Sequence, residues 1–147
     1  MKKVNIFIEA FGRRKESTVR VRLYQLKGKE SLAFNETKIN NGDILINFKK
    51  IEEYFPGDMN KLKYLAPLKS LNYSGKFAIL AKAAGGGING QLEAFIHALS
   101  RALEKIDKEN RPHLKKKGFL TRDARAKERR KAGYAQKARA RKQSPKR

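Results

Sequence analysis

Residues 76–106 read KFAILAKAAGGGINGQLEAFIHALSRALEKI and contain the clearest secondary-structure signals in the chain. The first eight residues form a short apolar run typical of a strand. Glycines 85–87 follow, and the apolar residues after them recur at spacings of three and four, as on the buried face of an amphipathic helix. These residues are Ile88, Leu92, Phe95, Ile96, Leu99, Leu103 and Ile106. We therefore predict a strand, a glycine turn and a long helix that ends near Asn110, before Pro112.

Three segments upstream have the pattern of further strands. Apolar residues occupy alternate positions in Val4–Ala10 and again in Thr18–Leu26, which is the period of a half-buried strand. A third strand is predicted at Ile44–Phe48. In the second segment we expect Val19, Val21 and Leu23 to face the core. The alternating residues Arg20, Arg22 and Tyr24 would then point outward.

The middle of the chain has turn and helix signals. Asn41-Gly42 favours a hairpin turn, because both residues tolerate positive φ, and Lys27–Lys38 before it has the character of a loop. Ile51–Phe55 predicts a short helix that stops at Pro56-Gly57. A second helix is expected after a cap at Asn60, with Pro67 kinking it or ending it early.

Charge divides the chain into two parts. Among its 147 residues, positions 1–110 have a net charge of +8, whereas positions 111–147 contain 16 Lys and Arg against 2 Asp and Glu, a net +14. We predict a globular body over 1–110 and a basic extension over 111–147. Such a tail repels itself, so it favours a polyanionic partner.

Nucleic acid is a better partner than a membrane. No run approaches the roughly 18 to 20 apolar residues of a spanning helix, and the tail has no apolar face. The start, MKKVNIFIE, is better interpreted as a strand than as a signal peptide, because its apolar run is short and contains Asn5 and Glu9. The absence of cysteine excludes disulfides and fits a reducing, RNA-containing compartment.

Cations on the predicted body form one candidate RNA site. Gly12-Arg13-Arg14-Lys15 joins the first two strands and places three adjacent cations at a turn. Arg20 and Arg22 would stand on the outer face of a rigid strand, where a guanidinium can bind a phosphate through two hydrogen bonds. A solvated loop is the alternative for the turn.

The glycine run has two readings of equal weight. Gly85, Gly86 and Gly87 precede a helix, where backbone N–H groups could approach an RNA phosphate or a nucleotide. They could equally serve only a tight turn. Neither GxxxxGK[ST] nor GxGxxG is present, so the case for nucleotide binding is weak.

The extension has the densest candidate site. Thr121 can cap a polar helix over Arg122–Ala132, which would form only against a partner or the body. Its cations could neutralise many phosphates through counterion release. The candidates are Lys115, Lys116, Lys117, Arg122, Arg125, Lys127, Arg129, Arg130, Lys131, Arg139 and Arg141.

Catalytic patterns are weak. His97 lies among apolar neighbours on the predicted helix, His113 lies beside the tail, and Glu52-Glu53 diverge on a helix. No metal-ligand spacing occurs, so we expect no cofactor and no metal. A small phosphotransferase and an architectural DNA-binding protein are the weaker alternatives.

Four stretches resemble the universal small-subunit ribosomal protein nine family, and the match covers most of the chain. They are GRRKESTVRVRL (12–23), IEEYFP (51–56), GGGINGQLEAFIHALSRAL (85–103) and RPHLKKKGFLTRDARAKERRKAG (111–133). The last is the most specific, because its order of basic, Gly, Thr-Arg-Asp and Glu-Arg-Arg-Lys elements is hard to reach by composition alone.

The resemblance implies an α+β fold, a small mixed β-sheet with helices packed on it (ribosomal S5-domain-2-like), with an extended basic C-terminal tail. It implies a non-enzymatic constituent of the small-subunit head that binds ribosomal RNA and neighbouring ribosomal proteins. It further implies that the tail reaches the peptidyl-site tRNA, with Lys146 and Arg147 as candidate contacts. The expected location is a cytoplasmic ribosome, with an organellar one as the alternative.

Overall fold

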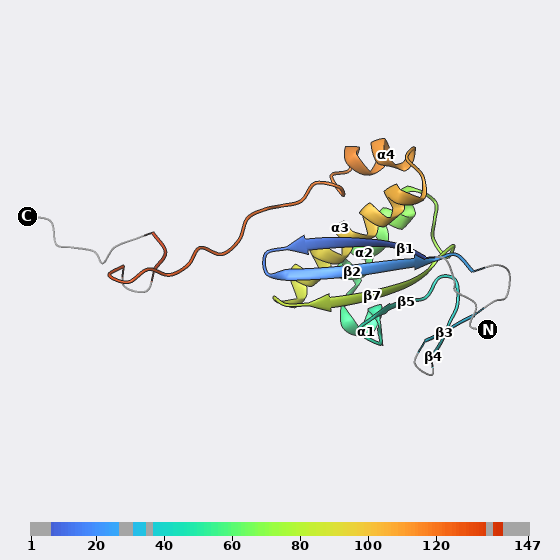
Figure 1. Cartoon of the computed structure of the whole chain (residues 1–147), viewed down its shortest axis with the longest axis horizontal. Coiled ribbons are helices and arrows are strands. Elements are labelled where there is room, and N and C mark those ends of the chain that lie inside the picture. The colour runs from blue at the N-terminus through green and yellow to red at the C-terminus, as the bar shows by residue number, and fades with distance from the viewer. Residues whose placement is uncertain (1–6, 27–30, 35–36, 135–136, 140–147) are drawn as a thin grey trace, which may run out of the picture.

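The computed structural model describes residues 7–26, 31–34, 37–134 and 137–139. Its elements, in chain order, are β1 (Phe7–Arg14), β2 (Ser17–Tyr24), β3 (Leu32–Phe34), β4 (Thr37–Ile39), β5 (Ile44–Ile46), β6 (Lys49–Lys50), α1 (Ile51–Tyr54), α2 (Asp58–Ser70), β7 (Ala78–Ala84), α3 (Ile88–Ile106) and α4 (Asn110–Lys116). Five strands form one sheet in the order β1-β2-β7-β5-β6, and β3 and β4 form a separate hairpin. Figure 1 shows the helices α2 and α3 behind this sheet.

Strand directions make the sheet mixed. β2 pairs antiparallel with β1 on one side and with β7 on the other. β5 pairs parallel with β7 and antiparallel with β6. A parallel pair needs a long connection, and here it contains α1 and α2. The predicted α+β fold, a mixed sheet with helices packed on it, is confirmed.

The main core lies between the sheet and α3. Val19, Val21 and Leu23 are buried on the inner face of β2, as their alternation predicted. The buried stripe of α3 meets them, with Phe95 and Leu99 fully enclosed. Burial of such a side chain contributes about 1.5–3 kcal/mol to stability, so this layer fixes the sheet and helix together.

Part of the outer face of the sheet is also covered. A second cluster joins the outward residues of the sheet to the β3–β4 hairpin: Tyr24, Leu26, Ile39, Leu45, Ala78 and Leu80, with Leu32 packed against them. The prediction of a loop over Lys27–Lys38 is therefore wrong for the strand residues 32–34 and 37–38. Tyr24 points outward as predicted, yet the hairpin buries it.

Several predicted boundaries differ from those of the structure. Asn41-Gly42 forms a turn, but β4 and β5 on either side of it are not paired, so the predicted hairpin is wrong. The second helix begins at Asp58 and continues through Pro67 to Ser70. Asn60 lies within it, with its Nδ2 donating to Pro56 O at 2.6 Å. Residues 4–6 of the first predicted strand lie outside the described residues.

The packed part of the chain continues beyond the predicted boundary at residue 110. The helix α3 ends at Ile106, and α4 begins at Asn110 with Pro112 in its first turn, where proline is tolerated. Leu114 of α4 is fully buried, and Phe119 and Leu120 pack against the same core. The extension thus leaves the body after Leu120.

Residues 121–131 have no helical structure, so the polar helix predicted over Arg122–Ala132 does not form against the body, and its formation against a partner stays a prediction. Figure 1 shows this segment running away from the body as an extended chain. A helix without an apolar face gains little from packing, and a short one is marginal in water. Within the described ranges, no helix combines the length and apolar character that crossing a membrane requires.

Candidate nucleic-acid interface

The turn between β1 and β2 presents two of its three predicted cations to solvent. Arg14 and Ser17 pair across it, leaving Lys15 and Glu16 as a two-residue loop. Lys15 has φ +51°, the left-handed conformation that such tight hairpin turns use. Arg13 and Lys15 are exposed and can reach a phosphate from this end of the sheet.

Arg14 has a different environment, because it is only 9% exposed. Its Nε donates to Glu93 Oε2 at 2.5 Å, and its Nη1 donates to the carbonyl oxygen of Arg125 at 2.8 Å. Its Nη2 lies 3.0 Å from Asp123 Oδ2. These contacts bind the first residues of the extension to the body, so the guanidinium group of Arg14 is used within the protein, unlike those of the exposed cations.

The carboxylate of Asp123 is contacted by two arginines, Arg125 and Arg14. The side chain and backbone N–H of Arg125 donate to its carboxylate, and Arg14 lies close by. Hydrogen bonding from Arg125 is the main reason that the pKa of Asp123 lies well below its usual range. The carboxylate therefore stays ionised at neutral pH and continues to hold the start of the extension.

Arg20 and Arg22 stand on the outer sheet face as predicted. Arg22 Nε donates to Glu9 Oε2 at 2.6 Å, which raises the pKa of Arg22, whereas Arg20 lies 3.9 Å from Glu9. Their guanidinium groups also lie over aromatic rings, Arg20 over Phe11 and Arg22 over Phe7. Stacking and pairing fix both side chains in place.

The glycine run has a clear packing role. Gly85 and Gly86 have φ of +72° and +63°, and a Cβ on either would overlap Glu16 or Ser17 at the β1–β2 turn. Gly90 in the first turn of α3 approaches the Ser17 hydroxyl as well. Gly87, the N-cap of α3, has open space around it. The tight-turn reading thus accounts for Gly85 and Gly86, and Gly87 is the position of the three with room for a ligand.

The end of α4 and the extension present most of the predicted tail cations on an exposed surface: Lys115, Lys116, Lys117, Arg122, Arg125, Lys127, Arg129, Arg130 and Lys131. An extended chain spans up to about 3.5 Å per residue, so residues 122–131 can follow a polyanion over roughly 30 Å. Arg139 pairs with Glu128 at 2.7 Å. Arg141, Lys146 and Arg147 lie outside the described residues.

Sequence reasoning missed three features that depend on tertiary structure. Glu93 comes from α3 to meet Arg14, and Lys82 of β7 stands beside Arg20. Phe48, at the β5–β6 turn, is 67% exposed on the same face as Arg20. The outward position of Lys82 follows from alternation along its strand, but its neighbour is fixed only by the register of β2 and β7.

The fold and its charged surfaces define a class: a small α+β protein whose basic extension leaves the body as an exposed chain. Residues 12–147 match the family described as ribosomal protein S9/S16. The chain is 43% identical over 122 residues to the small ribosomal subunit protein uS9 of Anaeromyxobacter sp. (strain K), covering 83% of each chain. It is 43% identical over 127 residues to that of Maridesulfovibrio salexigens, covering 86% of this chain and 87% of the relative.

The chain belongs to the ribosomal protein S9/S16 family. The family consists of ribosomal structural proteins, so the prediction that this chain is not an enzyme is confirmed, and the phosphotransferase alternative is wrong.

Proposed function

We propose that this protein is a structural constituent of the small ribosomal subunit, where its body and extension bind ribosomal RNA in the head. The observation that carries the proposal is the extension itself. It leaves the body as an exposed chain whose cations face solvent, while Arg14 holds its first residues. Such a segment gains by lying along RNA, because binding releases the counterions of many phosphates.

The body supplies a second contact region in this proposal. Arg13 and Lys15 at the β1–β2 turn face solvent at the same end of the sheet from which Arg14 reaches residues 123 and 125. RNA lying along the start of the extension would therefore pass close to the turn cations. This arrangement supports binding by charge neutralisation and position rather than by base-specific recognition.

The proposal includes two further partners. The C-terminal residues Lys146 and Arg147 contact the backbone of peptidyl-site tRNA, and the body adjoins neighbouring ribosomal proteins of the head. The similarity to uS9 proteins over more than four fifths of the chain supports this placement. We propose a cytoplasmic ribosome as the location.

Purified small subunits from the source cells test the assignment. Quantitative mass spectrometry should find this chain in a one-to-one ratio with other proteins of the subunit, and comparing cytoplasmic with organellar ribosomes locates it. Subunits that lack the chain would contradict the assignment. Comparable affinity for duplex DNA and for head RNA would favour the architectural DNA-binding alternative.

A further inference from the structure

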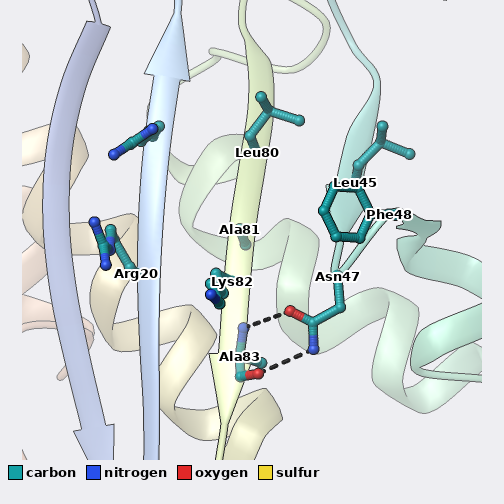
Figure 2. Close-up of a pocket in the computed structure, with 9 residues that line it drawn as sticks. Arg20, Leu45, Asn47, Phe48, Leu80, Ala81, Lys82 and Ala83 are labelled. Carbon is teal, nitrogen blue, oxygen red and sulfur yellow. Dashed lines mark hydrogen bonds between the residues drawn. The ribbon is translucent and has the colours of Figure 1, made fainter. Parts of the chain in front are cut away.

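A groove of about 510 Å³ lies on the outer face of the sheet, across β2, β7 and the end of β5. Leu45 and Leu80 form its apolar floor, and Arg20, Lys82 and Phe48 surround it (Figure 2). The β3–β4 hairpin covers the neighbouring part of this face but leaves the groove open. Its volume is in the range that holds small ligands, and one nucleotide fits that range.

Two cations stand directly opposite each other beside the groove. Arg20 and Lys82 are register partners on the antiparallel strands β2 and β7. Like charges in this position destabilise a sheet. Among the described residues, Lys82 has no carboxylate partner, and the Glu9 carboxylate near Arg20 already accepts a hydrogen bond from Arg22. An anion bound between Arg20 and Lys82 would relieve the repulsion.

Phe48 has a positive φ, which is an unfavourable backbone conformation for a bulky residue. Asn47 and Phe48 form the two-residue turn between β5 and β6, with φ of +47° and +68°. Asn is common at such positions, but the second is usually glycine, and a bulky residue there is strained. A large, exposed aromatic ring thus stands beside the groove at a strained backbone position, and such strain is the kind of local cost found at binding sites.

The turn that carries Phe48 is held firmly. Asn47 Nδ2 donates to the Ala83 carbonyl oxygen at 2.9 Å, and Ala83 N–H donates back to Asn47 Oδ1 at 3.0 Å (Figure 2). The Asn47 amide group also donates to the hydroxyl of Tyr54, which in turn donates to Gln91. These bonds fix the position of the ring relative to β7.

We propose that this groove binds one unpaired nucleotide of RNA, with its base against Phe48 and its phosphate between Arg20 and Lys82. The inference rests on the proposed RNA-binding function and assigns it a further contact. Unpaired bases are the ones that can stack on aromatic side chains, whereas paired bases in an RNA helix have their faces covered. A base with an attached phosphate matches an apolar floor bordered by an aromatic ring and two cations.

Phe48→Gly in the full-length protein separates binding from folding. Glycine relieves the strain at φ +68°, so the variant should unfold at the same or a higher temperature than the wild type. Its affinity for an oligoadenylate of about ten nucleotides should nevertheless fall roughly five- to a hundredfold, the loss expected from one base–aromatic stack. Fluorescence anisotropy measures the affinity. Met59→Ala, which removes an equally exposed side chain on α2, should leave it unchanged.

The salt dependence of the affinity distinguishes the contribution of the Phe48 ring from that of the two cations. Arg20→Gln and Lys82→Gln should each reduce the slope of log affinity against log salt by about 0.7, whereas Phe48→Gly should leave the slope unchanged. Lys63→Gln, an exposed cation on α2, is the matched charge control.

The possible results are distinguishable. If the wild type binds head ribosomal RNA but Phe48→Gly binds the oligoadenylate as well as the wild type does, or if neither binds it, the groove assignment is overturned and the proposed function stands. If the wild type binds no head RNA, the proposed function itself fails. In reconstituted subunits, Phe48→p-benzoylphenylalanine should cross-link to RNA, and a cross-link to a protein alone would overturn the nucleotide assignment.

Discussion

The guanidinium group of Arg14 lies 3.0 Å from the carboxylate of Asp123 and joins the end of β1 to the start of the extension. The same guanidinium group also pairs with the carboxylate of Glu93 in α3. One buried cation thus connects three parts of the chain that are far apart in sequence. Through these contacts Arg14 holds the first residues of the extension against the body.

Arg14→Ala should release the extension and destabilise the body. Charge-assisted hydrogen bonds contribute about 1.5–3 kcal/mol each, but Glu93 and Asp123 can be resolvated, so the net cost should be about 1–3 kcal/mol. Urea unfolding measures the cost, and hydrogen exchange at residues 123–125 should become faster. Arg13→Ala, which removes the exposed neighbour, is the control. Equal exchange in both variants would contradict the anchoring role.

Gly12→Ala should disturb the packing of α3 on β1. A Cβ at Gly12 would overlap the backbone of Ala94 and Ala98. Backbone cannot move aside as a flexible side chain can, so we expect a loss of about 1–3 kcal/mol or more in the free energy of unfolding. Gly87→Ala, where a Cβ meets open space, should cost at most about 1 kcal/mol. Similar losses in the free energy of unfolding at both positions would contradict the close packing of α3 on Gly12 of β1.

Acidification should weaken the fold through His97. Burial, with smaller effects from Arg101 and Arg122, lowers the pKa of His97, so the folded protein favours the neutral ring. Its contribution to stability is complete above the unfolded pKa of about 6.5 and is lost as the pH falls toward the folded value. Thermal unfolding from pH 7 to pH 5 should show a decline that His97→Gln reduces. An identical decline in the variant would assign it to other groups.

Removing the charges of Lys146 and Arg147 tests the proposed tRNA contact. The double substitution to Ala should weaken tRNA binding at the peptidyl site while the protein still assembles into subunits, because most of the basic extension remains. Filter binding of tRNA to reconstituted subunits measures the first effect, and mass spectrometry the second. Unchanged tRNA affinity in fully assembled subunits would remove these residues from the contact.

Local alternation and helical periodicity predicted much of the body. The pattern at Val19, Val21 and Leu23 identified the inner face of β2, and the apolar stripe of α3 was visible from Leu92 to Leu103. The same alternation, followed from Ala10 through Gly12, would have placed Arg14 on the inner face. Three adjacent basic letters favoured a surface interpretation instead.

Other features could not be predicted because they depend on long-range pairing. The burial of Tyr24 requires the β3–β4 hairpin to fold over the outer sheet face. The opposition of Arg20 and Lys82 requires the register of two strands that are far apart in sequence. The polar helix over Arg122–Ala132 was predicted only against a partner or the body, and the absence of an apolar face explains why it does not form against the body.

If the extension binds RNA through its exposed cations, removing some of those cations should change how the affinity depends on salt concentration. The triple variant Arg129→Gln, Arg130→Gln and Lys131→Gln leaves the contacts of Arg14 intact. We expect its slope of log affinity for head RNA against log salt to be smaller than that of the wild type by about 2. The control variant Lys63→Gln, Lys69→Gln and Lys108→Gln removes the same charge from exposed positions on the body and should retain the wild-type slope. Equal slopes for both variants would contradict RNA binding through the exposed cations of the extension.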